Sequence, residues 1–269
     1  MNITIKNPHE DQHGNQKENI FIAFDKNNQY IGHAYLVLTV NHDQIKEIPV
    51  LIYFDIELVI EDKTTRRFLF DNVMKRARVL RARYPHYKAL AYTGFMTNNE
   101  KLAFYLENGL TESYTIIMEK SLSDHRKTDC NFDLRVKCLN IHSEDLTHYE
   151  HAYNKLFLTP LDKNMLFEQS KNAHFNLLEF YEESVVIGGC TLFEKDGYGY
   201  LESLYILPSE RGKGYAKKIM NYVLNYFASV NLSKSQLEVW DRNRVALNLY
   251  RSLGYQEVKN QMMLPGKDL

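Results

Sequence analysis

Between residues 133 and 264, the spacing of apolar and polar positions switches between the period of strands and the period of helices. Three β-rich runs separated by acidic or glycine-containing turns predict an antiparallel meander. Apolar residues then recur at helical spacing, which predicts a long amphipathic helix before a final strand, helix and strand. The predicted strands are 133–140, 175–182, 185–194, 198–207, 236–240 and 255–264, and the predicted helices are 143–156, 162–172, 214–230 and 244–253.

The first half of the chain repeats part of this pattern when the two halves are overlaid with a constant shift of 145 positions. No gap is needed, and the matching residues fall inside corresponding strand or helix patterns. Upstream of these matches the first half is too short for both of the helices that precede the meander. The matching pairs are Glu57 with Glu202, Arg66 with Arg211, Asn98 with Asn243, Tyr105 with Tyr250, and Gly109 with Gly254.

Length and the repeat together predict two domains. The chain has 269 residues, which exceeds the size at which one core usually suffices. A stretch without apolar periodicity at 121–131 predicts the linker between them. We expect an α/β protein of the α+β type, with tandem domains at 1–120 and 132–269. Each domain is predicted to be a mixed, mainly antiparallel sheet flanked by helices.

Composition limits the classes of partner. With 33 basic and 34 acidic residues the net charge is −1, so no global excess favours nucleic acid or an anionic membrane. The cysteines, Cys130, Cys138 and Cys190, are odd in number and lack metal-ligand spacing, which favours a reduced compartment and no metal site. No run approaches the roughly 20 apolar residues that span a bilayer. We therefore expect a soluble, cytoplasmic protein, either a monomer or a homodimer.

The segment from Glu202 to Ala216 runs from a predicted strand through a short glycine loop into a helix. Backbone N–H groups at a helix start lack intrahelical partners, and glycine lets the backbone approach a pyrophosphate closely. Positive charge is added by Arg211, Lys213, Lys217 and Lys218. The spacing fits neither G-x-x-x-x-G-K-[ST] nor G-x-G-x-x-G, which disfavours an ATP or dinucleotide site. The loop therefore predicts another kind of pyrophosphate site.

Two patterns together identify a family resemblance. Arg211, Gly214 and Ala216 fill the pattern [QR]-x-x-G-x-[GA]. A later segment fills the pattern Asn-x-x-Ala-x-x-Leu-Tyr-x-x-x-Gly-[FY] at every position. Both resemble the motifs of the GNAT superfamily of N-acetyltransferases, over roughly 133–264 and more loosely over 20–120. The residues of the second pattern are Asn243, Ala246, Leu249, Tyr250, Gly254 and Tyr255.

The resemblance implies two domains with the acyl-CoA N-acyltransferase fold and acetyl-CoA as the only cofactor. Asn243 would be a polar contact to the pantetheine arm or to the following loop. Backbone groups of Leu204 and Ile206 would pair with that arm as an added strand. The pyrophosphate would be held by Arg211 and by the amides of Gly212, Lys213, Gly214, Tyr215 and Ala216.

The resemblance also implies the chemistry. A neutral primary amine of a small molecule or peptide would attack the acetyl carbonyl directly in a ternary complex. Glu202 stands four positions before Ile206, as does a glutamate that removes the amine proton, often through water, in the family's diamine acetyltransferases. Tyr250 matches a tyrosine that protonates the departing thiolate. A main-chain amide near Leu204 to Ile206 would stabilise the oxyanion.

Plainer interpretations of the same residues stay open. Glu202 can be a surface residue of a half-exposed strand, and Tyr250 shares a helical face with apolar residues and can belong to the core. The loop can also serve a non-catalytic acyl-CoA sensor or interaction module. Tandem domains of this fold also occur in aminoacyl transferases that use transfer RNA, but those need a broad basic surface, and here the charge is balanced.

The same shift of 145 positions predicts that the N-terminal half has lost its cofactor site. It places Arg67, Leu69 and Asp71 where the C-terminal half has Gly212, Gly214 and Ala216. Side chains would then occupy the loop, and a carboxylate would face the phosphates. We therefore expect a degenerate companion domain that shapes or covers the substrate cleft.

Overall fold

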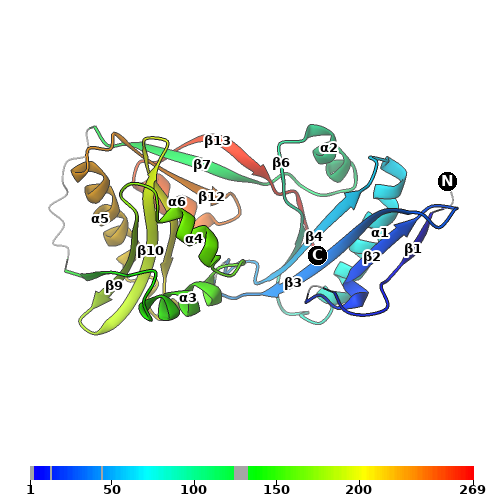
Figure 1. The fold of residues 1–269 in the computed structure, drawn as a ribbon, viewed down its shortest axis with the longest axis horizontal. Coiled ribbons are helices and arrows are strands. Elements are labelled where there is room, and N and C mark those ends of the chain that lie inside the picture. The colour runs from blue at the N-terminus through cyan, green and yellow to red at the C-terminus, as the bar shows by residue number, and fades with distance from the viewer. Residues whose placement is uncertain (1–2, 13, 44, 124–132) are drawn as a thin grey trace. The chain divides into compact units, whose positions relative to one another are not determined.

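The computed structural model describes residues 3–12, 14–43, 45–123 and 133–269 (Figure 1). Contacts within the chain define two compact units, one formed by Met1–Tyr114 with Met262–Leu269 and the other by Thr115–Gln261. Both are mixed α/β units, as predicted. No helix in these ranges is long and apolar enough to cross a membrane.

The N-terminal unit is built on a six-stranded sheet in the order β1-β2-β3-β4-β5-β14. The first four strands are antiparallel, β4 and β5 are parallel, and β14 is antiparallel to β5. Helix α1 connects the parallel pair. The elements are β1 (Thr4–Lys6), a 3₁₀ turn (Lys17–Asn19), β2 (Ile20–Phe24), β3 (Tyr30–Val40), β4 (Val50–Leu58), α1 (Lys63–Arg81), β5 (Ala89–Tyr92), β6 (Phe95–Met96), α2 (Asn99–Glu107) and β14 (Gly266–Asp268).

The core of this unit lies on one face of its sheet. Leu69 and Val73 of α1 and Tyr105 of α2 pack with Leu36 and Phe54 of the sheet in one apolar cluster. Because successive side chains of a strand point to opposite faces, the other face of β3 and β4 carries the intervening residues. Most of these are polar or aromatic, with Val37 and Leu51 as aliphatic exceptions, and the described residues before β2 form no α-helix that could cover them.

The C-terminal unit uses an eight-stranded sheet in the order β6-β13-β7-β12-β11-β10-β9-β8. The strands β9 to β11 form the predicted antiparallel meander, β8 adds an antiparallel strand beside β9, and β11 and β12 are parallel. The predicted elements are confirmed, with small shifts at their ends. They are β7 (Tyr114–Ser121), β8 (Arg135–Cys138), α3 (Asp145–Leu156), α4 (Lys163–Gln169), β9 (Asn176–Glu182), β10 (Val185–Lys195), β11 (Tyr198–Ile206), a 3₁₀ turn (Pro208–Glu210), α5 (Tyr215–Ser229), β12 (Lys234–Trp240), α6 (Arg244–Ser252) and β13 (Gln256–Met263).

Helices cover both faces of this second sheet. Tyr149 of α3 and Leu166 of α4 pack in one buried cluster with Leu177 of β9. On the opposite face, Phe180 of β9 lies against Tyr222 of α5, with ring centroids 5.6 Å apart. The described part of the N-terminal unit has no helix on the face that corresponds to the one covered by α3 and α4 here.

Each sheet takes its sixth strand from the other half of the sequence. In both sheets four antiparallel strands are followed by a parallel strand, β5 or β12, and then by an antiparallel one. Beside β5 that strand is β14, from the last residues described, whereas beside β12 it is β7, from the first half. The contact-defined units therefore differ from the expected domains at 1–120 and 132–269. The linker predicted at 121–131 lies mostly outside the described residues, and Ser121 ends β7.

Candidate active site

Strands β11 and β12 separate just after Leu201, next to the residues predicted to hold the pantetheine arm. They pair only from Gly199 to Leu201, opposite Ser235 to Leu237. Beyond this point β11 continues to Ile206 paired with β10, and β12 continues to Trp240 paired with β7. Leu204 and Ile206 thus lie where the β12-facing edge of β11 has no ladder partner among the described strands. Such an edge can receive an extended ligand as an added strand.

Glu202 is the extra residue of a β-bulge at this separation. Leu201 lies opposite Leu192 and Ser203 lies opposite Thr191, so Glu202 has no partner on β10. A bulge changes the direction in which side chains point, and bulges are frequent beside active sites. The side chain of Gln169, at the end of α4, donates a hydrogen bond to the Glu202 carboxylate. Glu202 therefore lies on the sheet face covered by α3 and α4.

The Glu202 carboxyl combines access with an altered pKa. The residue is exposed to solvent, yet the surrounding protein desolvates it enough to raise its pKa above the ordinary 4.5. Nearby Glu238 raises the pKa further, while Gln169 and Lys195 oppose the shift. A reachable carboxylate with a raised pKa suits general base catalysis near neutral pH.

The glycine loop leaves backbone amides open at the start of α5. Gly212 and Gly214 have φ of +79° and +86°, a region that other residues rarely adopt. A Cβ atom at either glycine would meet no atom within 4 Å. Gly214 is the N-cap of α5, and no side chain caps the helix. The amides from Gly212 to Ala216 can therefore reach an anion.

The charged residues of the loop have partners within the protein. The Arg211 Nε donates to the carbonyl of Ile206 at 3.1 Å, which ties the loop to the end of β11. Lys213 pairs with Glu210 at 2.9 Å. The Tyr215 side chain is buried, and its hydroxyl donates to Glu182 of β9. The backbone amides, rather than these side chains, are thus the open donors of the loop.

Tyr250 and Asn243 both belong to α6. Tyr250 is 8% exposed, and burial raises its pKa to about 12. The Tyr250 ring packs against Tyr255, with ring centroids 5.8 Å apart. Asn243 caps α6, because its Oδ1 accepts from the amide of Ala246 at 3.2 Å.

Two residues of the site were not singled out from the sequence. Gln169 contacts Glu202, and the hydroxyl of Tyr153 on α3 has a pKa raised to about 12 by burial and then by Glu202. Both lie on the early helices, where no motif marks individual positions. Cys190 is completely buried, and burial raises the pKa of its thiol, which disfavours it as a nucleophile. The described residues include no cluster of metal-ligating side chains.

The corresponding region of the N-terminal unit is a continuous helix. Helix α1 begins at Lys63 and passes through Arg67, Leu69 and Asp71, the positions that match the glycine loop. Its first turn is capped by Asp62, whose carboxylate accepts from the Thr65 amide at 2.7 Å. The positions that match the glycine loop thus lie inside a helix that is capped by a carboxylate, whereas no side chain caps α5.

Comparisons with known proteins find similarity to acetyltransferases. Residues 137–255 match the family described as Acetyltransferase (GNAT) family. A mouse thialysine N-epsilon-acetyltransferase is 39% identical over 59 residues, which are 22% of this chain and 35% of that protein. A ribosomal protein bS18-alanine N-acetyltransferase of Haemophilus ducreyi is 27% identical over 131 residues, which are 44% of this chain and 88% of that protein. A GCN5-related N-acetyltransferase structure from Sphaerobacter thermophilus shares the fold, with a TM-score of 0.51, 12% identity, and coverage of 93% of this chain and 81% of that one.

Proposed function

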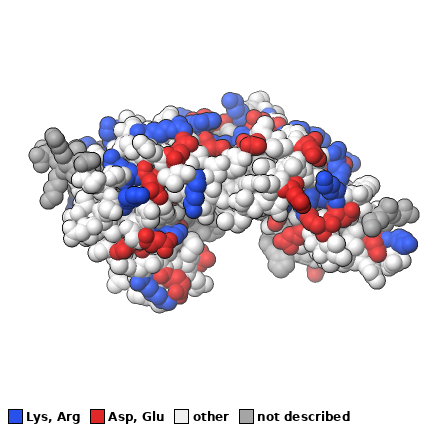
Figure 2. Space-filling model, turned by 90° about the horizontal axis from the view of Figure 1, so that it is seen from above, with Lys and Arg blue, Asp and Glu red and all other residues white. Residues whose placement is uncertain are grey.

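Because the chain belongs to the acetyltransferase (GNAT) family through residues 137–255, we propose that it transfers an acetyl group from acetyl-CoA to a primary amine. One observation carries the proposal: open amides at the start of α5 adjoin the strand whose unpaired edge carries Glu202. The amine would belong to a small molecule or a peptide. On the face seen in Figure 2, acidic and basic side chains are interspersed, which favours such an acceptor over nucleic acid.

The fit of acetyl-CoA rests on two sets of backbone groups. The amides from Gly212 to Ala216 would bind the pyrophosphate, and Arg211 would hold that loop against the end of β11. The groups of Leu204 and Ile206 would pair with the pantetheine arm, and one of their amides would stabilise the oxyanion. Asn243 would fix the start of α6 beside the arm. When bound, acetyl-CoA supplies an activated thioester carbonyl.

Glu202 would act as the base. Its carboxylate would take a proton from the incoming ammonium, directly or through a water molecule, and release the neutral amine for attack. Gln169 would orient the carboxylate by its hydrogen bond. The raised pKa makes Glu202 a stronger base than an ordinary surface glutamate, and its exposure lets an amine reach it.

Replacing Tyr250 with phenylalanine tests its proposed role as the acid that protonates the coenzyme A thiolate. Because the pKa of Tyr250 is raised to about 12, the hydroxyl keeps its proton throughout the working pH range. Y250F should lower kcat by about 10-fold to 100-fold, with an unchanged Kd for acetyl-CoA. Steady-state rates and calorimetric titration measure the two quantities. An unchanged kcat would make Tyr250 a core residue.

Calorimetric titration with acetyl-CoA tests the cofactor site. We expect one molecule per chain, since Asp62 caps the matching helix of the N-terminal unit. Gly214→Asp should abolish binding, because it adds a carboxylate at the phosphate site and strains a residue at φ of +86°. Gly197→Asp has a similar φ of +80° and open surroundings, so it controls for strain. Equal binding by both variants, or two sites per chain, would contradict this assignment.

The alternative function is a non-catalytic sensor that binds acyl-CoA. The two functions differ in turnover, not in binding. A wild-type protein that binds acetyl-CoA but releases no thiol with any of a panel of diamines, amino acids and peptides would support the sensor. The raised pKa of Glu202 favours the enzyme, because a sensor needs no base.

A further inference from the structure

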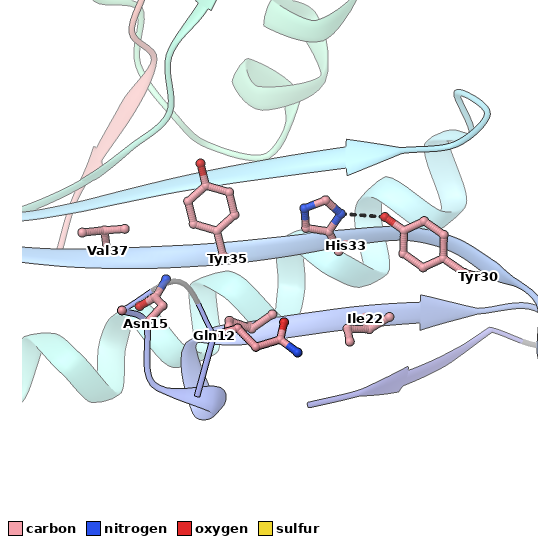
Figure 3. A pocket seen from close by; sticks show the side chains of 9 residues that line it. Gln12, Asn15, Ile22, Tyr30, His33, Tyr35 and Val37 are labelled. Atoms are coloured by element: carbon pink, nitrogen blue, oxygen red, sulfur yellow. Dashed lines mark hydrogen bonds between the residues drawn. The ribbon is translucent and has the colours of Figure 1, made fainter. Parts of the chain in front are cut away.

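A cavity lies within the N-terminal unit, on residues that take no part in the candidate active site. Its volume is about 670 Å³, within the range of small-molecule sites. Figure 3 shows that side chains of β3 form one wall, while Ile22 of β2 and the segment with Gln12 and Asn15 lie across from it. This is the sheet face opposite α1, and the helices described in that unit do not cover it.

The wall on β3 is a row of aromatic rings. His33 lies 6.2 Å from Tyr30 and 6.5 Å from Tyr35 between ring centroids, with interplanar angles of 29° and 18°. The Tyr30 hydroxyl and the His33 Nδ1 share a hydrogen bond of 2.7 Å, which fixes both rings (Figure 3). The row continues through Tyr53 of β4, 6.2 Å from Tyr35. Tyr30, His33 and Tyr35 thus present a nearly parallel, partly fixed aromatic surface to the cavity, while Tyr53 lies behind them at an angle of 54° to Tyr35.

Carboxylates on β4 give this surface a negative potential. A Glu57 oxygen lies 3.9 Å from His33 Nε2, and its side chain is 64% exposed. Burial raises the pKa of Tyr35, and Asp55 and then Glu57 raise it further, so both carboxylates act on the wall. Lys101 lies 3.7 Å from Asp55 and offsets the negative charge of that carboxylate. The Glu57 carboxylate lies beside His33 instead. The residues that line the cavity include no lysine or arginine.

We propose that this cavity binds an organic cation, an ammonium group carried on an apolar or aromatic body. The negative faces of the aromatic rings and the carboxylate of Glu57 attract the charge. Ile22 and Val37 provide apolar contacts for the body of the ligand. The side-chain amide oxygens of Gln12 and Asn15 can accept hydrogen bonds from its N–H groups. The site does not depend on acetyl transfer, because none of its residues belongs to the C-terminal unit.

Three ligands of one shape but different charge test this proposal: 2-phenylethylammonium, 2-phenylethanol and 3-phenylpropionate. The readout is the chemical shift of the His33 ring protons during titration, because it reports on this cavity alone. We expect saturable binding of the ammonium ligand, about fivefold or more weaker binding of the alcohol, and no binding of the carboxylate. Equal affinity of the ammonium and the alcohol, or no response to the ammonium, would overturn the proposal.

Variants of Tyr35 and Glu57 separate recognition from folding. Tyr35→Leu and Glu57→Gln should each weaken binding of the ammonium several-fold, whereas Tyr35→Phe retains the ring and should bind almost as the wild type does. Tyr87→Leu is the matched control, since Tyr87 is an exposed tyrosine of the same unit outside the cavity. Circular dichroism verifies the fold of each variant. Unchanged affinity in folded Tyr35→Leu would refute the assignment.

Discussion

Replacing Glu202 with glutamine is expected to lower kcat/KM by about 10²-fold to 10⁴-fold, the usual contribution of a general base. Glutamine keeps the size of the side chain and can still accept from Gln169, so the bulge should persist. The Kd for acetyl-CoA should stay unchanged, because the loop at Gly212 to Ala216 is untouched. Initial rates of thiol release with an accepted amine measure the effect. A loss below about threefold would leave Glu202 a surface residue.

The pH dependence gives an independent test of the same residue. Glu202 acts as a base only when deprotonated, and its pKa is raised above 4.5. The rate should therefore increase with pH through that raised pKa and fall as the pH is lowered through it. Tyr250, with a pKa of about 12, should not limit the rate on the alkaline side below that pH. A Glu202→Gln profile with the same acidic limb would assign that limb to another group.

Deleting Met262–Leu269 is expected to unfold the N-terminal unit. The deletion removes β14, whose Gly266 and Asp268 pair with Tyr92 and Leu90 of β5. It also removes the bond from the Leu269 amide to the carbonyl of Ala89, and the buried side chain of Leu264. At about 1 kcal/mol per hydrogen bond and about 2 kcal/mol for a buried leucine, the loss approaches the stability of an ordinary domain.

Two point variants examine this contact without shortening the chain. In Gly266→Val, the Cβ atom would lie 2.9 Å from Leu90 Cδ1 and 3.2 Å from the Ala91 carbonyl, so β14 should be displaced. Lys267→Ala lies on the same strand but removes only a partly exposed side chain, and should unfold at nearly the wild-type urea concentration. Hydrogen exchange should show lost protection on β4 and β5 in the deletion and in Gly266→Val. Protected amides there would show that β14 is dispensable.

Local sequence patterns were sufficient to predict the position and type of most helices and strands of the C-terminal half. The helix predicted at 214–230 is α5, Tyr215–Ser229, and the meander agrees with the predicted runs to within one residue at each end. These elements have clear apolar periods and end at glycine, proline or acidic turns. The loop motif likewise located the open helix start, because the left-handed conformation at Gly214 is a local requirement.

Other features depend on contacts that a sequence does not display. The exchange of β7 and β14 was missed because no strand was predicted at either segment, and a local pattern does not show which sheet a strand joins. The bulge at Glu202 arises from the register against β10. Helix α4 ends at Gln169, although apolar spacing predicted a helix to residue 172, so the residue beside Glu202 is a helix terminus.

The exchange of strands has a consequence for synthesis. As the nascent chain leaves the ribosome, β5 emerges with one edge open, and its partner β14 follows only after nearly all of the second half. Arg81 and the carbonyl of Leu269, which form one of the closing hydrogen bonds, are 188 positions apart. The half that is made first therefore completes its sheet last, and during translation one edge of β5 stays without its strand partner, as an open edge to which another chain could pair.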